Sequence, residues 1–518
     1  MKKILGIELG STRIKSVLIN EQGKVLAQGS YEWKSELVNG LWSYLLEEVE
    51  RGVKASYKDL LTNYKKEYKK TLTKIDAIGV SAMMHGYLAF DINDNLLTPF
   101  RTWQNVNTFE ASTKLSKLFK YNIPMRWSIA HYYQAILNGE EHVKNVAFIT
   151  TLAGYVHYKL TSKKVLGVGD ASGMFPVKNG NYNDKMVKKF DALLSKNGIY
   201  TSLISILPKV LLAGENAGTL TKEGACWLDE SGKLSDGVIL CPPEGDAGTG
   251  MVATNSVKPR TANVSAGTSA FLMAVLEKEL DGYYKEIDVV TTPSGAPVAM
   301  VHVNNFTLEM TAWTNLFSEV VSLGGGNISR DKLFESLYKK SLESDQDLGN
   351  ILGFNFLLGE PIVGVDNGVP IILRNPSGNL TLANFMKMQI YSSLGALSIG
   401  CEILSNENVK IDSVYGHGGF FKTEFVGQSA MSVAVGAPVT VMQNAGEGGA
   451  YGMALLALFA YLKESDLSKF LDGVFKNAKK TTVTANEKEK TAFNNFIIKY
   501  KKALLIAKNA HKVFIKTH

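Results

Sequence analysis

Alternation of apolar and polar stretches near the N-terminus predicts a β-hairpin. Residues 4–7 and 14–19 are mostly apolar and predict two strands, with Glu8-Leu9-Gly10-Ser11-Thr12 as the turn between them. The backbone N–H groups and two hydroxyls of such a tip can hold phosphate oxygens. Taken alone, the pattern is explained more simply as an ordinary hairpin.

The same pattern returns about half a chain later. Ala262-Asn263-Val264-Ser265 precedes Ala266-Gly267-Thr268-Ser269, and an apolar stretch follows over residues 271–276. Recurrence at this distance indicates a duplicated domain. Two hydroxyl-rich hairpins are also able to hold a polyphosphate from two sides, which favours a functional interpretation of both.

Longer patterns alternate between helix and strand and indicate an α/β protein. Strands are predicted over 75–81 and 409–415, and Gly324-Gly325-Gly326-Asn327 is expected to join two helices. The predicted helices cover residues 42–64, 148–160, 380–404, 451–462 and 493–507.

A buried strand over 237–241 is followed by Pro242-Pro243 and then by Gly245-Asp246-Ala247-Gly248-Thr249-Gly250. Glycines leave room for a ligand beside Asp246 and predict a loop. A carboxylate in that setting suits a general base that takes a proton from a substrate hydroxyl. An aspartate in an ordinary turn is the alternative.

Several other side chains have the chemistry of a sugar site. Met84 and His85 end the strand predicted over 75–81, and His85 is equally well explained as a buried structural histidine. Trp103-Gln104-Asn105 combines an aromatic face with two amides, a mixture that suits sugar C–H faces and hydroxyls. Asp170, in a polar loop over 167–173, is either structural or directed at the substrate.

Glycine-rich stretches in the second half suggest nucleotide contacts. Gly416-His417-Gly418-Gly419 follows the strand predicted over 409–415, and Lys422 comes three residues later. Ala445-Gly446-Glu447-Gly448-Gly449-Ala450 opens an apolar helix whose N-terminus suits a phosphate. Close packing of that helix on a sheet explains its glycines equally well.

Composition narrows the class of protein. A chain of 518 residues is too long for one ordinary core, and 45% hydrophobic with 20% charged residues is typical of soluble globular proteins. The net charge of +7 comes mainly from dispersed lysines, so nucleic-acid binding is not expected. Three isolated cysteines, Cys226, Cys241 and Cys401, and the absence of a signal peptide or membrane span predict a cytoplasmic protein. For the basic C-terminal helix, binding to a membrane surface is the lesser alternative to packing.

Taken together, these stretches resemble the FGGY family of carbohydrate kinases over essentially the whole chain. The resemblance implies two actin-like (ribonuclease-H-type) α/β domains with a catalytic cleft between them. We expect a sugar-binding domain over 1–255, which carries the catalytic base Asp246, and a nucleotide-binding domain over 256–518. Glu447-x-x-Ala450-x-Gly452-x-Ala454 looks like part of the adenosine-side signature of the family.

The resemblance also implies ATP and Mg²⁺ as cofactors, with a sugar as the other small-molecule partner. Glu8 and Asp246 are the expected metal contacts, and Met84, His85, Trp103, Gln104 and Asn105 are expected to bind the sugar. The residues expected to bind the nucleotide are Gly10, Ser11, Thr12, Lys15, Gly267, Thr268, Ser269, Gly418, Gly419 and Lys422. Dimers are common in the family, which leaves a homodimer open.

Within the family, Met84-His85-Gly86 and Asp170-Ala171-Ser172-Gly173 are most similar to xylulokinases, which implies conversion of D-xylulose to D-xylulose 5-phosphate. Three positions depart from that pattern: Glu8 replaces an Asp, Gln104-Asn105 replaces Asn-Asp, and Ala247 replaces an Asn. L-Ribulose, another polyol or a sugar acid therefore stays open as the substrate. A nucleotide-switched binding protein on the same scaffold, without sugar chemistry, is the remoter alternative.

Overall fold

The computed structural model describes residues 1–442 and 448–514, and its backbone forms two compact units. Unit 1 comprises Met1–Val257, Tyr283–Val298 and Glu447–Asn477. Unit 2 comprises Lys258–Gly282, Ala299–Gly446 and Ala478–His518. Unit 1 therefore takes up two later segments of the chain, whereas we expected one boundary between residues 255 and 256. That boundary stays a prediction for the functional domains.

The sheet of unit 1 has the strand order β13-β6-β1-β2-β3. Its first hairpin joins β1 (Ile4–Leu9) to β2 (Arg13–Ile19), and β1 also pairs in parallel with β6 (Ala77–Ala82). The other strands of this sheet are β3 (Val25–Glu32), β13 (Ile239–Leu240) and β14 (Glu244–Gly245), which also pairs with β6. The predicted hairpin at residues 4–19 is confirmed.

The sheet of unit 2 repeats this arrangement, in the order β18-β16-β15-β21-β22-β23. Here β15 (Thr261–Ala266) pairs antiparallel with β16 (Ala270–Val275) and parallel with β21 (Ser413–His417). The remaining strands are β18 (Pro297–Val303), β22 (Val439–Met442) and β23 (Lys480–Val483). The α/β class and the predicted duplication are confirmed by this repeated strand pattern.

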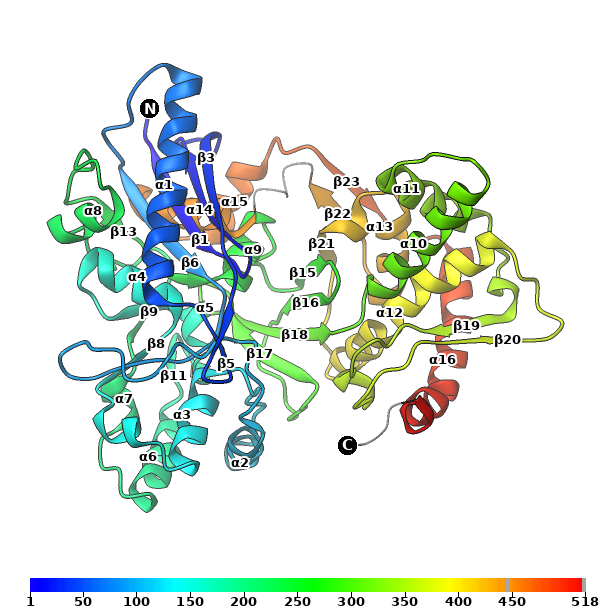
Figure 1. The fold of residues 1–518 in the computed structure, drawn as a ribbon, viewed down its shortest axis with the longest axis horizontal. Coiled ribbons are helices and arrows are strands. Elements are labelled where there is room, and N and C mark those ends of the chain that lie inside the picture. Colours follow the sequence, from blue (N-terminus) through cyan, green and yellow to red (C-terminus); the bar gives the residue numbers. More distant parts are fainter. Residues whose placement is uncertain (443–447, 515–518) are drawn as a thin grey trace. The chain divides into compact units, whose positions relative to one another are not determined.

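Two helices cover the sheet of unit 1. The helix α1 (Leu46–Tyr68) packs on β3, and α14 (Gly448–Leu462) packs on β1 and on α9 (Asp246–Ala253). Figure 1 shows α14, in orange, beside the blue strand β1. The contact is close because Gly6 has no side chain: a Cβ there would overlap the carbonyl oxygen of Ala450. A helix from the end of the chain thus completes the core of unit 1.

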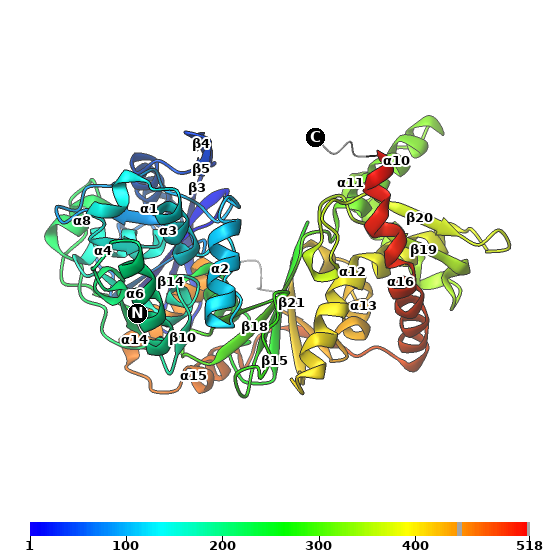
Figure 2. The same cartoon turned by 90° about the horizontal axis from the view of Figure 1, so that it is seen from below.

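Unit 2 is mainly covered by long helices. The helices α12 (Leu382–Asn406) and α13 (Val426–Val435) pack together, and both contact α16 (Glu487–Phe514). Figure 2 shows α12 and α13 next to β21. The apolar face predicted for the C-terminal helix packs inward, with Phe493, Phe496 and Tyr500 buried. A glycine-containing segment joins α10 (Leu308–Leu323) to α11 (Arg330–Lys340), as predicted.

Shorter elements complete the described chain. The helices are α2 (Phe109–Phe119), α3 (Ser128–Leu137), α4 (Leu152–Thr161), α5 (Val168–Ala171), α6 (Asp184–Lys196), α7 (Leu203–Ile206), α8 (Lys222–Leu228) and α15 (Leu467–Phe475). The strands are β4 (Glu36–Val38), β5 (Leu41–Ser43), β7 (Leu88–Phe90), β8 (Phe148–Thr150), β9 (Val165–Gly167), β10 (Val177–Lys178), β11 (Asn181–Tyr182), β12 (Lys209–Leu211), β17 (Ile287–Thr291), β19 (Ile351–Phe354) and β20 (Ile371–Arg374).

Two helix predictions placed the start of the helix too early. The helix expected over 42–64 begins at Leu46, because Leu41–Ser43 pairs with β4 as β5. The helix expected over 148–160 begins at Leu152, because Phe148–Thr150 pairs with β7 and the hydroxyl of Thr151 accepts the N–H of Gly154 as a helix cap. Local apolar content could not separate these short strands from the helices that follow.

Two predicted loops are helical. Residues 168–171 form the buried helix α5, and the glycine-rich stretch that begins at Asp246 is the first part of α9. Small residues are needed in α9 and α14 because the backbones of these two helices are in contact. A Cβ at Gly452 in α14 would overlap the carbonyl oxygen of Thr249 in α9. Among the described residues, no helix is long and apolar enough to cross a membrane.

Candidate active site

Asp246 is the first residue of α9 and lies directly after β14. Its Oδ1 accepts the N–H groups of Met84 (3.2 Å) and Ala247 (2.9 Å). Burial raises the pKa of Asp246 to about 6, so the carboxylate is largely ionised at neutral pH yet closer to neutrality than an exposed aspartate. The side chain is partly exposed, and such a group can receive a proton from a bound hydroxyl.

Glu8 is the last residue but one of β1 and lies close enough to Asp246 to feel its charge. Burial, and after it the charge of Asp246, raise the pKa of Glu8 to about 7, although Lys15 on the paired strand acts in the opposite direction. Its Oε2 accepts the N–H of Ala450 in the first turn of α14 (3.2 Å). Two carboxylates this close repel each other, and a cation placed between them would relieve that repulsion.

This pair fits Mg²⁺, which commonly binds one or two carboxylates and completes its shell with water and substrate phosphates. Among the described residues there is no group of three or more histidine, cysteine, aspartate or glutamate side chains that could hold a metal by themselves. Glu8 and Asp246 therefore suit a metal that arrives with a phosphorylated ligand, rather than a permanently enclosed ion.

Two further carboxylates lie buried behind Asp246. Glu244 accepts the N–H groups of Gly169 (3.2 Å) and Asp170 (2.9 Å), and burial raises its pKa to about 8. Asp170 accepts the hydroxyl of Thr151 (2.6 Å), and burial raises its pKa to about 7. Of the two alternatives for Asp170, the structural one is supported, because these bonds connect α5 to β14, the strand just before Asp246, and to the N-terminus of α4.

Met84 and His85 follow the end of β6, and the backbone N–H of Met84 contacts Asp246. The ring of His85 is buried, and its Nδ1 lies 3.0 Å from the carbonyl oxygen of Gly173. Burial lowers the pKa of His85 to about 3, so the ring is neutral. A carbonyl can only accept, so Nδ1 carries the proton and Nε2 is the acceptor that remains for another donor, such as a sugar hydroxyl.

The side chains of residues 103–105 differ in the groups that they leave available to a ligand. Trp103 is 39% exposed, and its indole N–H donates to the hydroxyl of Ser11 (3.3 Å). Gln104 has a buried Oε1 without a described partner. Asn105 is bound on both sides of its amide to the backbone of Trp42 and also donates to Thr102. These bonds give Asn105 a structural role, and its expected sugar contact stays a prediction.

The first hairpin is held from behind by aromatic side chains. The indole N–H of Trp33 donates to the carbonyl of Gly10 (2.7 Å), and the hydroxyl of Tyr44 donates to the carbonyl of Ser11 (2.7 Å). Thr12 is exposed, whereas Gly10 and Ser11 are partly exposed. Carbonyls bound from behind direct the N–H groups of the following peptides to the other side, where an anion can reach them.

The second hairpin, Gly267 to Ser269, is exposed at its tip and is held by different groups. The N–H groups of Phe306 (2.9 Å) and Thr307 (3.3 Å) donate to the carbonyl of Thr268, and the hydroxyl of Thr307 donates to the carbonyl of Gly267 (2.7 Å). No feature of the sequence drew attention to residues 304–307. A Thr before an apolar helix at this distance from a hairpin is too common a pattern to signal a role.

The remaining nucleotide candidates lie at the end of β21. Gly418 has a φ of 107°, and a Cβ there would overlap the carbonyl oxygen of Ala266, so only glycine fits. Gly419 has no atom within 4 Å of the Cβ position, which leaves an open surface. Lys422 is exposed after the short turn Gly419–Phe421. These residues share the same end of the unit 2 sheet with the second hairpin.

The structure describes only part of the segment that leads into α14. Ala445, Gly446 and Glu447 lie outside the described residues. Gly449, Ala450, Gly452 and Ala454 pack against Glu8, Gly6 and α9 in unit 1. Of the two explanations for these glycines, packing on a sheet is therefore supported by the contacts, and the expected adenosine-side role of Ala450, Gly452 and Ala454 stays a prediction.

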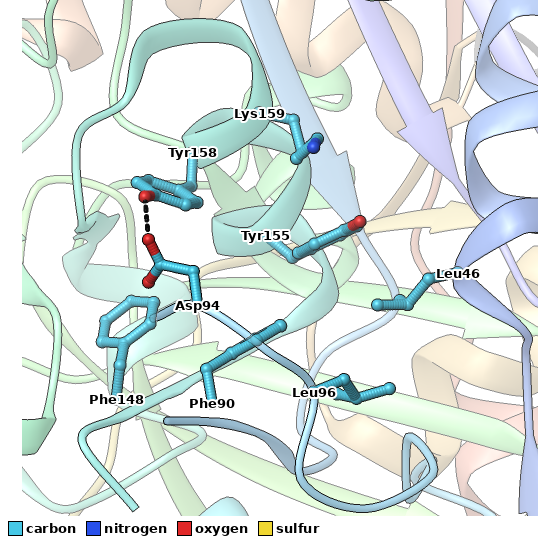
Figure 3. Close-up of a pocket in the computed structure, with 8 residues that line it drawn as sticks. All are labelled: Leu46, Phe90, Asp94, Leu96, Phe148, Tyr155, Tyr158 and Lys159. Carbon is cyan, nitrogen blue, oxygen red and sulfur yellow. Dashed lines mark hydrogen bonds between the residues drawn. The ribbon is translucent and has the colours of Figure 1, made fainter. Parts of the chain in front are cut away.

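A separate pocket of about 130 Å³ lies in unit 1 between α1, α4 and the segment that follows β7. Figure 3 shows the hydroxyl of Tyr158 bonded to Asp94 (2.6 Å), with the ring of Phe90 stacked on Tyr155. The pocket is lined by Leu46, Phe90, Asp94, Leu96, Phe148, Tyr155, Tyr158 and Lys159. None of the residues expected from the sequence to act on a sugar or nucleotide is among them.

Comparison with protein families identifies both halves of the chain. Residues 3–231 match the N-terminal domain of the FGGY family of carbohydrate kinases, and residues 262–461 match its C-terminal domain. A curated protein named xylulose kinase from Haemophilus influenzae is 24% identical over 88% of this chain and 90% of its own length. A xylulose kinase of Staphylococcus xylosus is 19% identical over the same shares.

Solved structures share the fold. A ligand-bound xylulose kinase from Lactobacillus acidophilus superposes with a TM-score of 0.79 at 17% identity, over 99% of this chain and 100% of the other. A gluconate kinase from the same organism gives 0.80 at 17% identity and 99% coverage of both chains. Plasmodium falciparum glycerol kinase with ADP gives 0.76 at 14% identity and 98% coverage of both. These likenesses confirm the expected two-domain, actin-like kinase fold.

Proposed function

Because this chain belongs to the FGGY family of carbohydrate kinases, we propose that it transfers the γ-phosphoryl group of ATP to the terminal hydroxyl of D-xylulose. That it is a sugar kinase which uses ATP follows from the family. The identity of the sugar, the roles of individual residues and the part of Mg²⁺ are the proposal. The remoter alternative, a binding protein without sugar chemistry, is set aside by membership in a family of kinases.

The observation that carries the proposal is the placement of Asp246. Its Oδ1 is held by the backbone N–H groups of Met84 and Ala247, and we assign Oδ2 to the substrate hydroxyl. Asp246 would accept the proton of the attacking sugar hydroxyl through Oδ2. At the same time the hydroxyl oxygen would form its bond to the γ-phosphorus, and the bond from the γ-phosphorus to the β-phosphate oxygen would break. The pKa of about 6 supports this role, since the base is ionised at pH 7 and still accepts a proton readily.

The backbone amides would hold the phosphates. Gly10, Ser11 and Thr12 in unit 1 and Gly267, Thr268 and Ser269 in unit 2 are the proposed donors, with Lys15 as a nearby cation. Gly418, Gly419 and Lys422 are proposed for the rest of the nucleotide. Phosphoryl transfer depends mostly on positioning and on charge stabilisation, which such fixed N–H groups provide.

Glu8 and Asp246 would hold Mg²⁺ together with phosphate oxygens. When bound, the ion supplies positive charge against the charge of the transferring phosphoryl group. Glu8 would keep its orientation through the N–H of Ala450. Its side chain is one methylene longer than the aspartate usual in the family, which allows that bond and a metal contact at the same time.

The sugar would lie against Met84, His85, Trp103 and Gln104. His85 would accept a hydroxyl at Nε2, Gln104 would use its unpaired Oε1, and Trp103 would cover an apolar face of the sugar. D-Xylulose is favoured by curated relatives that carry the name xylulose kinase. L-Ribulose or a kinase reaction on another polyol or sugar acid is the second candidate, because Gln104-Asn105 offers two neutral amides where the xylulokinase pattern has an asparagine followed by an aspartate.

The test is ADP release with Mg-ATP against D-xylulose, L-ribulose, D-ribulose, L-xylulose, glycerol and gluconate. We expect D-xylulose to raise the rate far above the sugar-free background and the product to be the 5-phosphate. A larger response to another member of the panel would replace D-xylulose as the substrate. No response to any sugar by a protein that binds ATP would reject the proposed reaction. The cytoplasmic location and a homodimer stay predictions.

A further inference from the structure

The exposed tip of the second hairpin depends on a neighbouring segment for its orientation. Three hydrogen bonds connect residues 304–307 to it, and all end on the carbonyls of Gly267 and Thr268. In a trans peptide the N–H points away from its C=O, so binding these two carbonyls from one side directs the N–H groups of Thr268 and Ser269 to the opposite side. Among the described residues, neither N–H donates to a protein acceptor.

The segment 304–307 is held in turn by one buried carboxylate. Glu360 is 0% exposed, and its Oε2 accepts the N–H groups of Asn304 (3.0 Å) and Asn305 (3.1 Å) and the side-chain amide of Asn305 (3.1 Å). Its own backbone pairs with Val365 in both directions, which fixes the position of the glutamate. Hydrogen bonds to an ionised acceptor are about twice as strong as neutral ones.

Two asparagines complete the same network. The Oδ1 of Asn305 accepts the N–H groups of Leu357 (2.9 Å) and Leu358 (2.8 Å), and the amide of Asn355 donates to the carbonyls of Asn305 (2.9 Å) and Phe306 (3.1 Å). All these residues are in unit 2, and Asn305 and Asn355 are buried. The chain from Glu360 to the hairpin therefore consists of short, fixed contacts without long flexible side chains.

We propose that Glu360 is a positioning residue for the nucleotide: it fixes residues 304–307, and through them it aims the N–H groups of Thr268 and Ser269 at phosphate oxygens. This inference rests on the proposed role of the second hairpin in phosphate binding. Glu360 itself touches neither nucleotide nor metal in this scheme, because its bonded oxygen faces backbone and side-chain N–H groups of its own unit.

The cost of burying this carboxylate supports a dedicated role. Burial raises the pKa of Glu360 to about 7, and its Oε1 is buried without a described partner. An acceptor at the Oε2 position is what the network needs, whereas the negative charge is expensive. A glutamine at this position keeps the acceptor and removes the charge, so comparison of Glu360→Gln with Glu360→Ala separates the need for this side chain from the need for its charge.

The experiment measures ATP affinity by titration calorimetry and the KM values for ATP and sugar in steady state. We expect Glu360→Ala to weaken ATP binding about 10-fold, the equivalent of about one charged hydrogen bond, with the sugar KM within about twofold. Glu360→Gln should stay within about threefold of the original chain. Thr307→Val, which removes one hydroxyl at the surface, should weaken ATP binding about threefold and keeps the test open if Glu360→Ala does not fold.

Glu489 provides the matched control in the same unit. It accepts the hydroxyl of Ser429 and pairs with Lys387 at 3.7 Å, far along the chain from the hairpin. Glu489→Ala should lower the unfolding temperature without changing ATP affinity. Equal losses of ATP affinity in Glu489→Ala and Glu360→Ala would overturn the inference, because the effect would then be general destabilisation.

Two outcomes separate this inference from the proposed function. A folded Glu360→Ala or Thr307→Val that binds ATP as tightly as the original chain, in a protein that does phosphorylate a sugar, overturns the positioning role alone. A protein without sugar-dependent turnover overturns the proposed reaction, while the binding measurements still decide the role of Glu360.

Discussion

The two units arrange the same strands around their hairpins but place different side chains at matching positions. In unit 1, Glu8 faces Lys15 on the antiparallel neighbour and Ser81 on the parallel neighbour. In unit 2, Ser265 holds the corresponding place and faces Phe271 and His417. Equivalent backbone positions thus carry a charged pair in one unit and uncharged or aromatic groups in the other.

This difference fits the proposal that one sheet arrangement serves two tasks. A hairpin with free N–H groups suits phosphate in either unit, because that property depends on the backbone. Proton transfer and metal binding depend on carboxylates, and in unit 1 Glu8 and Asp246 lie next to the hairpin. If unit 2 binds the nucleotide as proposed, a serine at the matching place would avoid repulsion of its phosphates, whereas a carboxylate there would oppose them.

The largest effect that we expect is a loss of turnover when Asp246 is replaced, which tests the contrast between the two units. Asp246→Asn should lower kcat about 1,000-fold, because the amide cannot take the proton of the attacking hydroxyl. The unfolding temperature should stay the same or rise, since the change removes the cost of burying a charge. Asp94→Asn, in the separate pocket of Figure 3, should leave kcat unchanged. Normal turnover by Asp246→Asn would assign the base to another residue.

The next effect tests the demand for glycine in unit 2. Gly418→Ala should lower the free energy of unfolding by about 2–3 kcal/mol, because it combines a left-handed φ with an overlap on Ala266. Gly419→Ala, which meets no atom within 4 Å, should change it by less than about 0.5 kcal/mol. Urea unfolding of both variants gives the comparison. Equal stabilities would mean that the strand end can relax around a side chain.

A smaller effect concerns the matching strand positions. Glu8→Gln should raise the Mg²⁺ concentration for half-maximal activity about 10-fold, because one proposed oxygen ligand loses its charge. Ser265→Ala, at the same place in unit 2, should shift it by less than about twofold. Titration of activity with Mg²⁺ at saturating ATP measures both. A larger shift for Ser265→Ala would contradict the division of tasks between the units.

The smallest effect that we expect is a pH dependence of the stability, caused by His157 in unit 1. Burial lowers the pKa of His157 to about 4, so this histidine is neutral in the folded chain and protonates with a pKa near 6.5 when unfolded. The unfolded state then binds more protons between pH 6.5 and 4, and stability falls as the pH drops through that range. We expect a loss of about 1 kcal/mol at pH 5.5 from this residue. His157→Gln should flatten the dependence in thermal unfolding between pH 5 and 7.5.

Local pattern was enough to predict both hairpins, since each tip and its strands are contiguous in sequence. It failed where the structure of a segment depends on contacts with another part of the chain. Nothing around Ala450 indicates that α14 packs on β1 in unit 1, because the evidence is the missing side chain at Gly6. The early start predicted for α1 has a similar cause, as Leu41–Ser43 becomes a strand only through β4.

The candidate site shows the same limit. Asp246 and Glu8 were predicted because a carboxylate at the end of an apolar stretch is visible in sequence. Asn105 was expected to bind sugar from its residue type, and only its bonds to Trp42 reveal a structural role. Glu360 was not considered, because a single glutamate in a polar stretch gives no sign that three N–H groups will converge on it.

The packing of α14 on β1 has a consequence for how the protein is made. Glu8 and its partner Ala450 are 442 positions apart, so a ribosome that adds about 5–20 residues per second needs roughly 20–90 s between them. Through that interval the first hairpin lacks its covering helix, and Glu8 remains in water with ordinary acidity. The nascent chain therefore has an uncovered apolar strand to which chaperones can bind. The pKa of Glu8 is raised only when synthesis is nearly complete.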